Sequence, residues 1–157
     1  MTVKFDHLLG RPYRVGVDHC LKLVRDFYAD NFGTIIRDYA VPVNWNANDL
    51  NLIEMIYERE GFEKVTDWSL KSLRPGDLLA VAVRSRNPNH FCIYLGGNEI
   101  LHHPLGELSR VEPLRDFWRM STCYVLRHPN TPDLSSVLPT TTIKDLLDAR
   151  YSVQAEA

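Results

Sequence analysis

Hydrophobic side chains recur at helical spacing in two stretches of the N-terminal half. Between about residues 18 and 31 the apolar positions follow an i, i+1, i+4, i+5 pattern, which predicts an amphipathic helix with one face toward a core. Asp18 is the expected N-cap of this helix, and Gly33 is the residue expected to end it. A similar pattern predicts a second helix over about residues 48–60, stopped by Gly61. The two apolar faces comprise Leu23, Val24, Phe27 and Tyr28 in the first helix and Leu50, Ile53, Ile56 and Tyr57 in the second.

Further along the chain the pattern changes to short apolar runs separated by turn residues. The segment "SLRPGDLLAVAVRS" holds a Pro75–Gly76 turn and then a predicted strand from about Leu78 to Val83. The segment "HFCIYLGGNEILHH" predicts two strands around a Gly-rich turn, and "LSRVEPL" and "STCYVLRH" are further strand candidates. Helices first and antiparallel strands afterwards favour an α+β fold, with N-terminal helices packed on a small antiparallel sheet.

The last part of the chain has a different composition. After residue 128, Pro, Thr and Ser dominate up to Thr142, and a short helix is predicted from Ile143 to Arg150. We therefore expect one folded domain over residues 1–128, followed by a linker and C-terminal tail over 129–157. This tail is either a docking segment for a partner or a frayed terminus.

Composition and charge narrow the classes of function. A chain of 157 residues suits a single domain, and its formal net charge of -2 gives no reason to expect a nucleic-acid partner. No apolar run approaches the roughly 20 residues that span a bilayer, so no membrane insertion is expected. The segment "MTVKFDHLLGRPYR" lacks the apolar core of a secretion signal. The protein is therefore expected to fold in a cytoplasm or to leave it by another route.

Three cysteines offer one candidate for chemistry. Their odd number and the lack of a Cys-x-x-Cys pair argue against a disulfide framework and a four-cysteine zinc site. Cys92 and Cys123 lie in strand-like runs and are expected to be small buried hydrophobes. Cys20 lies at the start of the first predicted helix, where the unpaired N–H groups and the helix dipole favour a thiolate. Because Cys20 also lies on the apolar face of that helix, the alternative is that it is a buried cysteine with only a structural role.

Three histidines provide the base that a cysteine nucleophile needs. His90 opens the first strand of the predicted hairpin, and His102 and His103 end the second. A three-residue loop, 96–98, would place His90 and His102 on one face of the sheet, whereas a two-residue loop, 96–97, would pair His90 with His103. Turn chemistry leaves both loops open. These histidines and Cys20 could also bind zinc, but adjacent residues on a strand face opposite sides, which argues against one shared site.

Taken together, these segments resemble a known family. "GRPYRVGVDHCLKLV", "LRPGDLLAVAV" and "NHFCIYLGGNEILHH" are similar, in order, to the motifs of the NlpC family of papain-like cysteine peptidases, which cleave peptidoglycan stem peptides. "LVRDFYADNFG" and "LHHPLGELSRVEPL" resemble its phage subset, the peptidase part of lambda-type tail assembly proteins and of tail-tip cell-wall peptidases. The resemblance covers about residues 8–128 and implies a papain-like NlpC-type domain.

The resemblance also implies roles for four residues. Cys20 matches the family nucleophile, His90 the general base and Tyr13 the tyrosine that helps to bind the oxyanion or the substrate. The third catalytic residue of the family usually follows the base by twelve positions, which implies His102. The chain departs from the family pattern at two positions close to the nucleophile. His19 stands where aspartate is usual, and Lys22 stands where glycine is usual.

The function implied is hydrolysis of peptidoglycan stem peptides by a DL-endopeptidase carried at a phage tail tip. Such an enzyme needs no cofactor or metal, and its partners would be the stem peptide and other tail-tip proteins. It would be made in the host cytoplasm, travel in the virion and act in the periplasm or cell wall. One alternative is a structural or assembly component of the tail tip with little or no activity. Another is a different amidase or an acyltransferase on the same scaffold.

Overall fold

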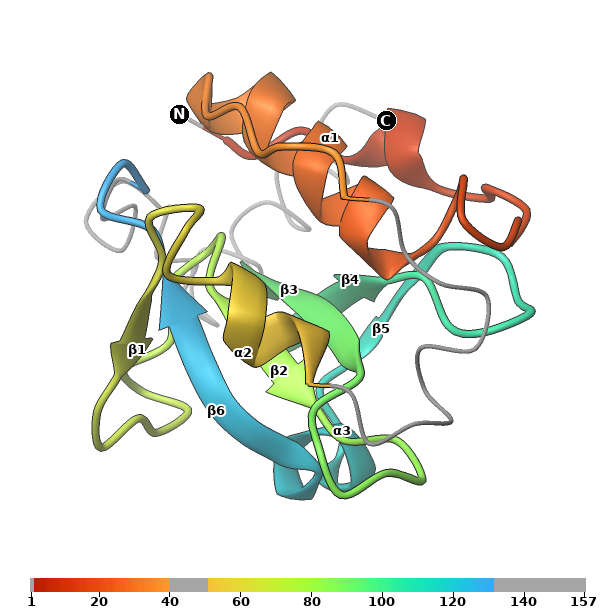
Figure 1. The fold of residues 1–157 in the computed structure, drawn as a ribbon. Coiled ribbons are helices and arrows are strands. Elements are labelled where there is room, and N and C mark those ends of the chain that lie inside the picture. The colour runs from red at the N-terminus through yellow and green to blue at the C-terminus, as the bar shows by residue number, and fades with distance from the viewer. Residues whose placement is uncertain (1, 40–50, 132–157) are drawn as a thin grey trace, which may run out of the picture.

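The helices and strands form an α+β fold with one antiparallel sheet, as predicted (Figure 1). The computed structural model describes residues 2–39 and 51–131. The elements are η1 (Asp6–Leu8), α1 (Cys20–Phe32), α2 (Leu52–Ile56), β1 (Glu63–Val65), β2 (Leu78–Val81), β3 (His90–Gly96), β4 (Glu99–His102), β5 (Arg110–Pro113), α3 (Asp116–Met120) and β6 (Thr122–Arg127). The strand order is β1-β6-β2-β3-β4-β5, and every neighbouring pair is antiparallel.

Strand β3 lies at the centre of the core, since every residue from its start to Leu95 is buried. Its side chains alternate between two apolar clusters on opposite faces of the sheet. The first cluster holds Phe91, Ile93 and Leu95 with the apolar face of α1, which packs against β3. The second holds Cys92 and Tyr94 with residues of β2, β4 and β6. Burial on both sides fixes the position of β3, and with it the position of His90 at its first residue.

Helix α1 has the predicted end but a different start. Gly33 is left-handed, with a φ of 63°, and ends the helix as expected. The N-cap is His19 and not Asp18, because the Asp18 carboxylate accepts a hydrogen bond from Arg14 Nε at 2.7 Å instead. The helix therefore begins at Cys20, which places the thiol at its first residue.

The second predicted helix is shorter than expected. Helix α2 covers only Leu52–Ile56, and the Asn51 side chain caps it by accepting a hydrogen bond from the Glu54 N–H at 3.0 Å. Residues 48–50 of the predicted helix lie outside the described residues. Cys123 was also predicted wrongly. It is exposed, because it falls on the outward side of β6, whereas Cys92 is fully buried as expected.

The turn before β2 joins the helix to the sheet. Gly76 has a φ of 97°, and a Cβ there would come within 2.9 Å of the Phe32 ring. The Tyr28 hydroxyl donates a hydrogen bond to the Gly76 carbonyl. Next to it, the fully buried Asp77 accepts hydrogen bonds from Arg127 Nη2 at 2.7 Å and Nε at 2.8 Å. These contacts hold the C-terminal half of α1 against the start of β2.

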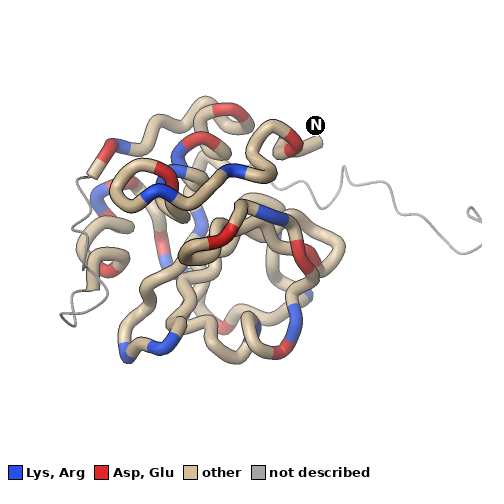
Figure 2. The backbone as a smooth tube through the Cα atoms, turned by 90° about the vertical axis from the view of Figure 1, so that its right-hand side faces the viewer, with Lys and Arg blue, Asp and Glu red and all other residues tan. Residues whose placement is uncertain are grey.

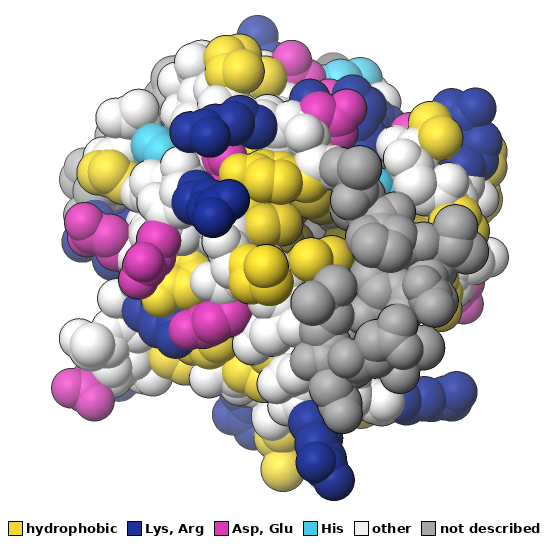
Figure 3. All heavy atoms as spheres, in the orientation of Figure 1, with side chains coloured by type: hydrophobic (Ala, Val, Ile, Leu, Met, Phe, Trp, Pro, Cys, Tyr) yellow, Lys and Arg dark blue, Asp and Glu magenta, His cyan; other side chains and the backbone are white. Residues whose placement is uncertain are grey.

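The surface of the described residues carries charges of both signs. Basic and acidic residues are interspersed along the backbone (Figure 2). On the face that carries α1 and α2, hydrophobic side chains gather at the centre, with charged side chains around them (Figure 3). Within residues 2–39 and 51–131, no helix has the length and apolar character needed to cross a bilayer. The predicted tail over 129–157 lies, apart from its first three residues, outside the described residues.

Candidate active site

A cleft of about 610 Å³ brings together three of the four residues that the sequence singled out. Tyr13, Cys20 and His90 all line it, although they come from the N-terminal segment, α1 and β3. His102 is fully buried and lies directly behind His90. His103 lines the same cleft as a further imidazole.

Cys20 carries a neutral thiol in this environment. Its side chain lies between the sheet and α1, and the residue is 8% exposed. Burial raises the pKa of the Cys20 thiol, and backbone hydrogen bonds from Phe91, Leu21 and Cys20 itself offset only part of that effect. The backbone groups of β3 and of the helix start therefore partly offset the effect of burial on the pKa of Cys20, and the thiol stays protonated.

His90 is a neutral imidazole at physiological pH. Burial, followed by the neighbouring His102 and His103, lowers its pKa to about 3. His90 Nε2 lies 2.9 Å from His102 Nδ1, a hydrogen bond between two buried rings. A neutral imidazole that shares a cleft with a protonated thiol is suited to general-base catalysis.

The hairpin register places His90 and His102 on one face. Cys92 pairs with His102 across β3 and β4, so His90, two residues before Cys92, shares their face. The turn itself differs from both loops considered from the sequence. Gly97 and Asn98 form a two-residue turn with φ values of 59° and 62°, and a β-bulge lies between Tyr94 and Gly96. The extra residue in the bulge produces the register that a three-residue loop would have given.

Glu112 is a site residue that the sequence did not reveal. Its Oε2 lies 2.8 Å from His102 Nε2 and also accepts a hydrogen bond from Arg110 Nε at 2.8 Å. Its Oε1 accepts a hydrogen bond from Trp118 Nε1. Burial alone would raise the pKa of Glu112, but the hydrogen bonds from His102, Arg110 and Trp118 outweigh burial and hold it at about 2. A carboxylate therefore stands behind the two histidines.

Tyr13 packs near Cys20 and against His103. The Tyr13 and His103 rings meet edge to face, with their centroids 5.3 Å apart. Burial, and then the proximity of Cys20, raise the pKa of the Tyr13 phenol, so its hydroxyl remains protonated and can donate a hydrogen bond. His103, the residue that follows β4, therefore packs against Tyr13, whereas His102 is bonded to His90.

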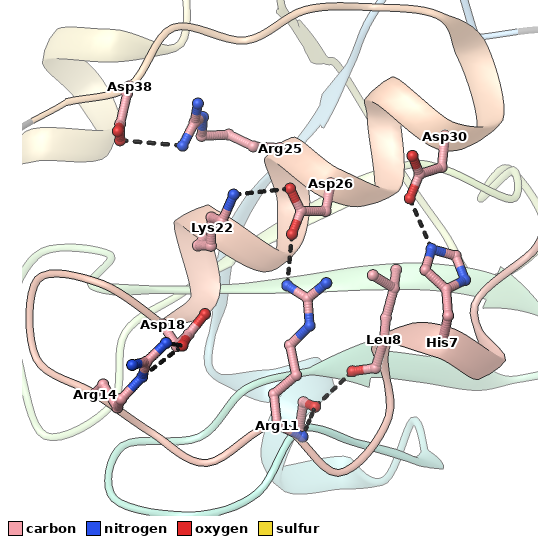
Figure 4. A network of polar contacts seen from close by, with 11 residues as sticks. His7, Leu8, Arg11, Arg14, Asp18, Lys22, Arg25, Asp26, Asp30 and Asp38 are labelled. Carbon is pink, nitrogen blue, oxygen red and sulfur yellow. Dashed lines mark hydrogen bonds and ion pairs between the residues drawn. The ribbon is translucent and has the colours of Figure 1, made fainter.

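Ion pairs hold the segment that carries Tyr13 against α1 (Figure 4). Arg11 Nη1 donates a hydrogen bond to Asp26 at 2.6 Å, and Lys22 Nζ donates to the other oxygen of Asp26 at 3.1 Å. The Arg11 N–H donates to Ser109 Oγ at 2.9 Å, which joins the same segment to the loop before β5. Lys22, one of the two departures from the family pattern, therefore pairs with α1 itself and is not among the residues that line the cleft.

The ligand set considered for zinc is not assembled. Among the described residues, the group of metal-type ligands consists of His90, Cys92 and His102, whose donor atoms lie within 4.8 Å of one another. Cys20 and His103 are not members of it. The facing nitrogens of His90 and His102 are hydrogen-bonded to each other, and the second nitrogen of His102 is bonded to Glu112.

Comparison with known proteins finds one family and two viral relatives. Residues 10–127 match the model of the NlpC/P60 family. The tail tip assembly protein K of Escherichia phage lambda is 36% identical over 122 residues, which are 78% of this chain and 59% of the relative. The tail tip assembly protein K of Escherichia phage N15 is 30% identical over 123 residues, 77% of this chain and 49% of the relative. The chain thus spans about half of the length of these two curated relatives.

Proposed function

The chain belongs to the NlpC/P60 family, and on that premise we propose that it is a cysteine endopeptidase that hydrolyses peptidoglycan stem peptides at a phage tail tip. The observation that carries the proposal is a cleft lined by both Cys20, at a helix start, and His90, which is hydrogen-bonded to His102. A nucleophile, a base and a group that orients the base are the parts that thiol-based peptide hydrolysis needs.

The neutral resting state determines the first step. As the Cys20 sulfur attacks the amide carbonyl, its proton passes to His90, and the resulting imidazolium is stabilised through His102. The Tyr13 hydroxyl and the Cys20 backbone N–H stabilise the oxyanion. His90 then returns the proton to the leaving amine, which departs as the thioester forms. Finally a water molecule, deprotonated by His90, hydrolyses the thioester and regenerates the thiol.

Arg84 on the cleft lining suits an anionic peptide, because guanidinium binds carboxylates through paired hydrogen bonds. Arg110 also lines the cleft, but its guanidinium already pairs with Glu112 and Glu107. Stem peptides carry free carboxylates beside the bond that DL-endopeptidases cleave. Specificity for the bond after D-glutamate rests on the family resemblance.

The location rests on the two relatives, both of which are named as tail tip assembly proteins. By that analogy the protein would be carried in the virion with other tail-tip proteins as partners. It would reach the cell wall from the periplasmic or outer side during penetration.

One experiment tests the enzymatic proposal. Purified chain is incubated with peptidoglycan, and the released muropeptides are identified by mass spectrometry. Cys20→Ala should release no product, whereas Cys123→Ser, which removes an exposed thiol that is not on the cleft lining, should match the wild type. Absence of wild-type product, or equal product from Cys20→Ala, would refute the peptidase.

A structural role in tail-tip assembly with little activity is the second candidate. The relatives are named for assembly, and His19 and Lys22 depart from the family pattern beside the nucleophile. This role would be favoured if the wild type leaves peptidoglycan intact while tails made with Cys20→Ala assemble normally and tails that lack the protein do not.

A further inference from the structure

We propose that Glu112 is a positioning residue that selects the tautomers of His102 and His90, so that the nitrogen of His90 left without a proton is Nδ1. This inference rests on the proposed function, because it assigns a role within the same site. It follows from three hydrogen bonds and from the number of protons that each partner can offer.

The protons of His102 and His90 can be assigned in turn, starting from the Glu112 carboxylate. Ionised Glu112 can only accept hydrogen bonds, so the contact of 2.8 Å places a proton on His102 Nε2. A neutral imidazole has one N–H, which leaves His102 Nδ1 as an acceptor. The contact of 2.9 Å then requires the proton of His90 on Nε2. His90 Nδ1 therefore keeps its lone pair and is the atom available to accept a proton from Cys20.

Without Glu112 the same pair of histidines has two equivalent arrangements. His102 could donate from Nδ1 to His90 Nε2, which would satisfy the same contact and place the proton of His90 on Nδ1. In that arrangement His90 has no basic nitrogen left for the thiol. The Glu112 carboxylate thus determines whether the His90–His102 pair can accept a proton from Cys20, although it contacts neither the nucleophile nor the substrate.

The surroundings of Glu112 keep it ionised and correctly placed. Arg110 and Trp118 contribute N–H donors only, so neither can supply the carboxylate with an acceptor that would favour its protonated form. The Trp118 ring packs edge to face against His102, with centroids 4.6 Å apart, and tilted against His90, with centroids 5.7 Å apart. The indole therefore holds the two imidazoles and their carboxylate in one unit.

Nuclear magnetic resonance of protein labelled with ¹⁵N in histidine reads the tautomers directly, without any substrate. Long-range ¹H–¹⁵N correlations should show Nε2–H in both His90 and His102 of the wild type, assigned with His90→Gln and His102→Gln. Glu112→Gln, whose amide can donate as well as accept, should populate the Nδ1–H form of both rings. Glu99→Gln, an exposed change on the neighbouring strand β4, should leave the spectrum unchanged.

The two proposals fail separately. A wild-type His90 with its proton on Nδ1, or a folded Glu112→Gln with unchanged tautomers, overturns the role of Glu112. The wild-type spectrum keeps this test decisive even where Glu112→Gln does not fold. If the tautomers behave as expected but the wild type cleaves no peptidoglycan, the proposed function fails and the tautomer assignment stands.

Turnover supplies a second readout. Glu112→Gln should lower kcat by about 100-fold with KM changed less than about twofold, because the wrong tautomer removes the base without altering the cleft. Glu112→Asp, which keeps an acceptor-only carboxylate, should recover part of the loss. Equal kcat in Glu112→Gln and wild type would contradict the role.

Discussion

His90 and His102 are hydrogen-bonded across the β3–β4 hairpin, with 2.9 Å between Nε2 of the first and Nδ1 of the second. The pair depends on backbone register, which sets His102 opposite Cys92, two residues from His90, while the next residue is also a histidine. His103 packs against Tyr13 instead. The two neighbouring imidazoles are therefore expected to differ sharply in their importance for turnover.

Replacing each histidine in turn tests that difference. His102→Ala should lower kcat about 100-fold or more, since in the proposed mechanism His102 orients the base. His103→Ala should lower it less than about tenfold, because it removes a ring that packs against Tyr13 and leaves the hydrogen bond between His90 and His102 in place. The measurement is the rate of muropeptide release by each variant. A greater loss for His103→Ala would mean that the active register differs from the one described.

The buried histidines should make the fold sensitive to acid. Burial lowers the pKa of His90 to about 3 and also lowers the pKa of His19, His102 and His103. Below about pH 6.5 the unfolded chain takes up protons that the folded chain does not, so their stabilising effect is complete above that pH and is lost as pH falls toward 3. His90 alone should reduce the free energy of unfolding by about 2 kcal/mol between pH 7 and pH 5.

Urea unfolding at several pH values between 5 and 7 measures this loss. Glu112 does not contribute to the change in this pH range. Its pKa is lowered from 4.5 to about 2, so the stability that it contributes is lost only below about pH 4.5. His90→Gln should give a shallower dependence on pH than the wild type. Identical slopes would show that His90 is not held neutral by the fold.

The ion pair between Asp77 and Arg127 should be important for stability. Asp77 is fully buried, and its removal would leave the partly buried Arg127 without its carboxylate. Asp77→Ala should lower the free energy of unfolding by about 3 kcal/mol. Asp116→Ala, which breaks the exposed pair with Arg119, is the matched control and should change it by less than about 1 kcal/mol. Equal effects in urea unfolding would contradict the importance given to burial.

The sequence pattern was sufficient where the buried side chains formed a regular stripe or a continuous run. The apolar face of α1 and the continuous hydrophobic run of β3 were both predictable, and they position Cys20 and His90. The class of fold followed from the same elements. The shortest elements were not predictable, because the three residues of β1 and the five of α3 include no buried side chain from which a period could be recognised.

The missing parts of the site depended on tertiary contacts. Glu112 lies on the edge strand β5. Charged side chains are common on edge strands that face solvent, so the sequence gives no sign that this one belongs to the site. Only the folded sheet shows that it reaches His102 and Trp118. The hairpin register was equally inaccessible, since a bulge adds one residue without a sequence signal that distinguishes it from a longer loop.

The bulge between Tyr94 and Gly96 limits how this hairpin can change length during evolution. Deletion of one residue from the tip would exchange the faces of all later positions on β4, placing His103 beside His90 and turning His102 away. Changes of two residues would preserve the present pairing. Natural variants of the tip should therefore differ in length by even numbers of residues. By this rule the length of the turn is constrained together with the histidines at the far ends of the two strands.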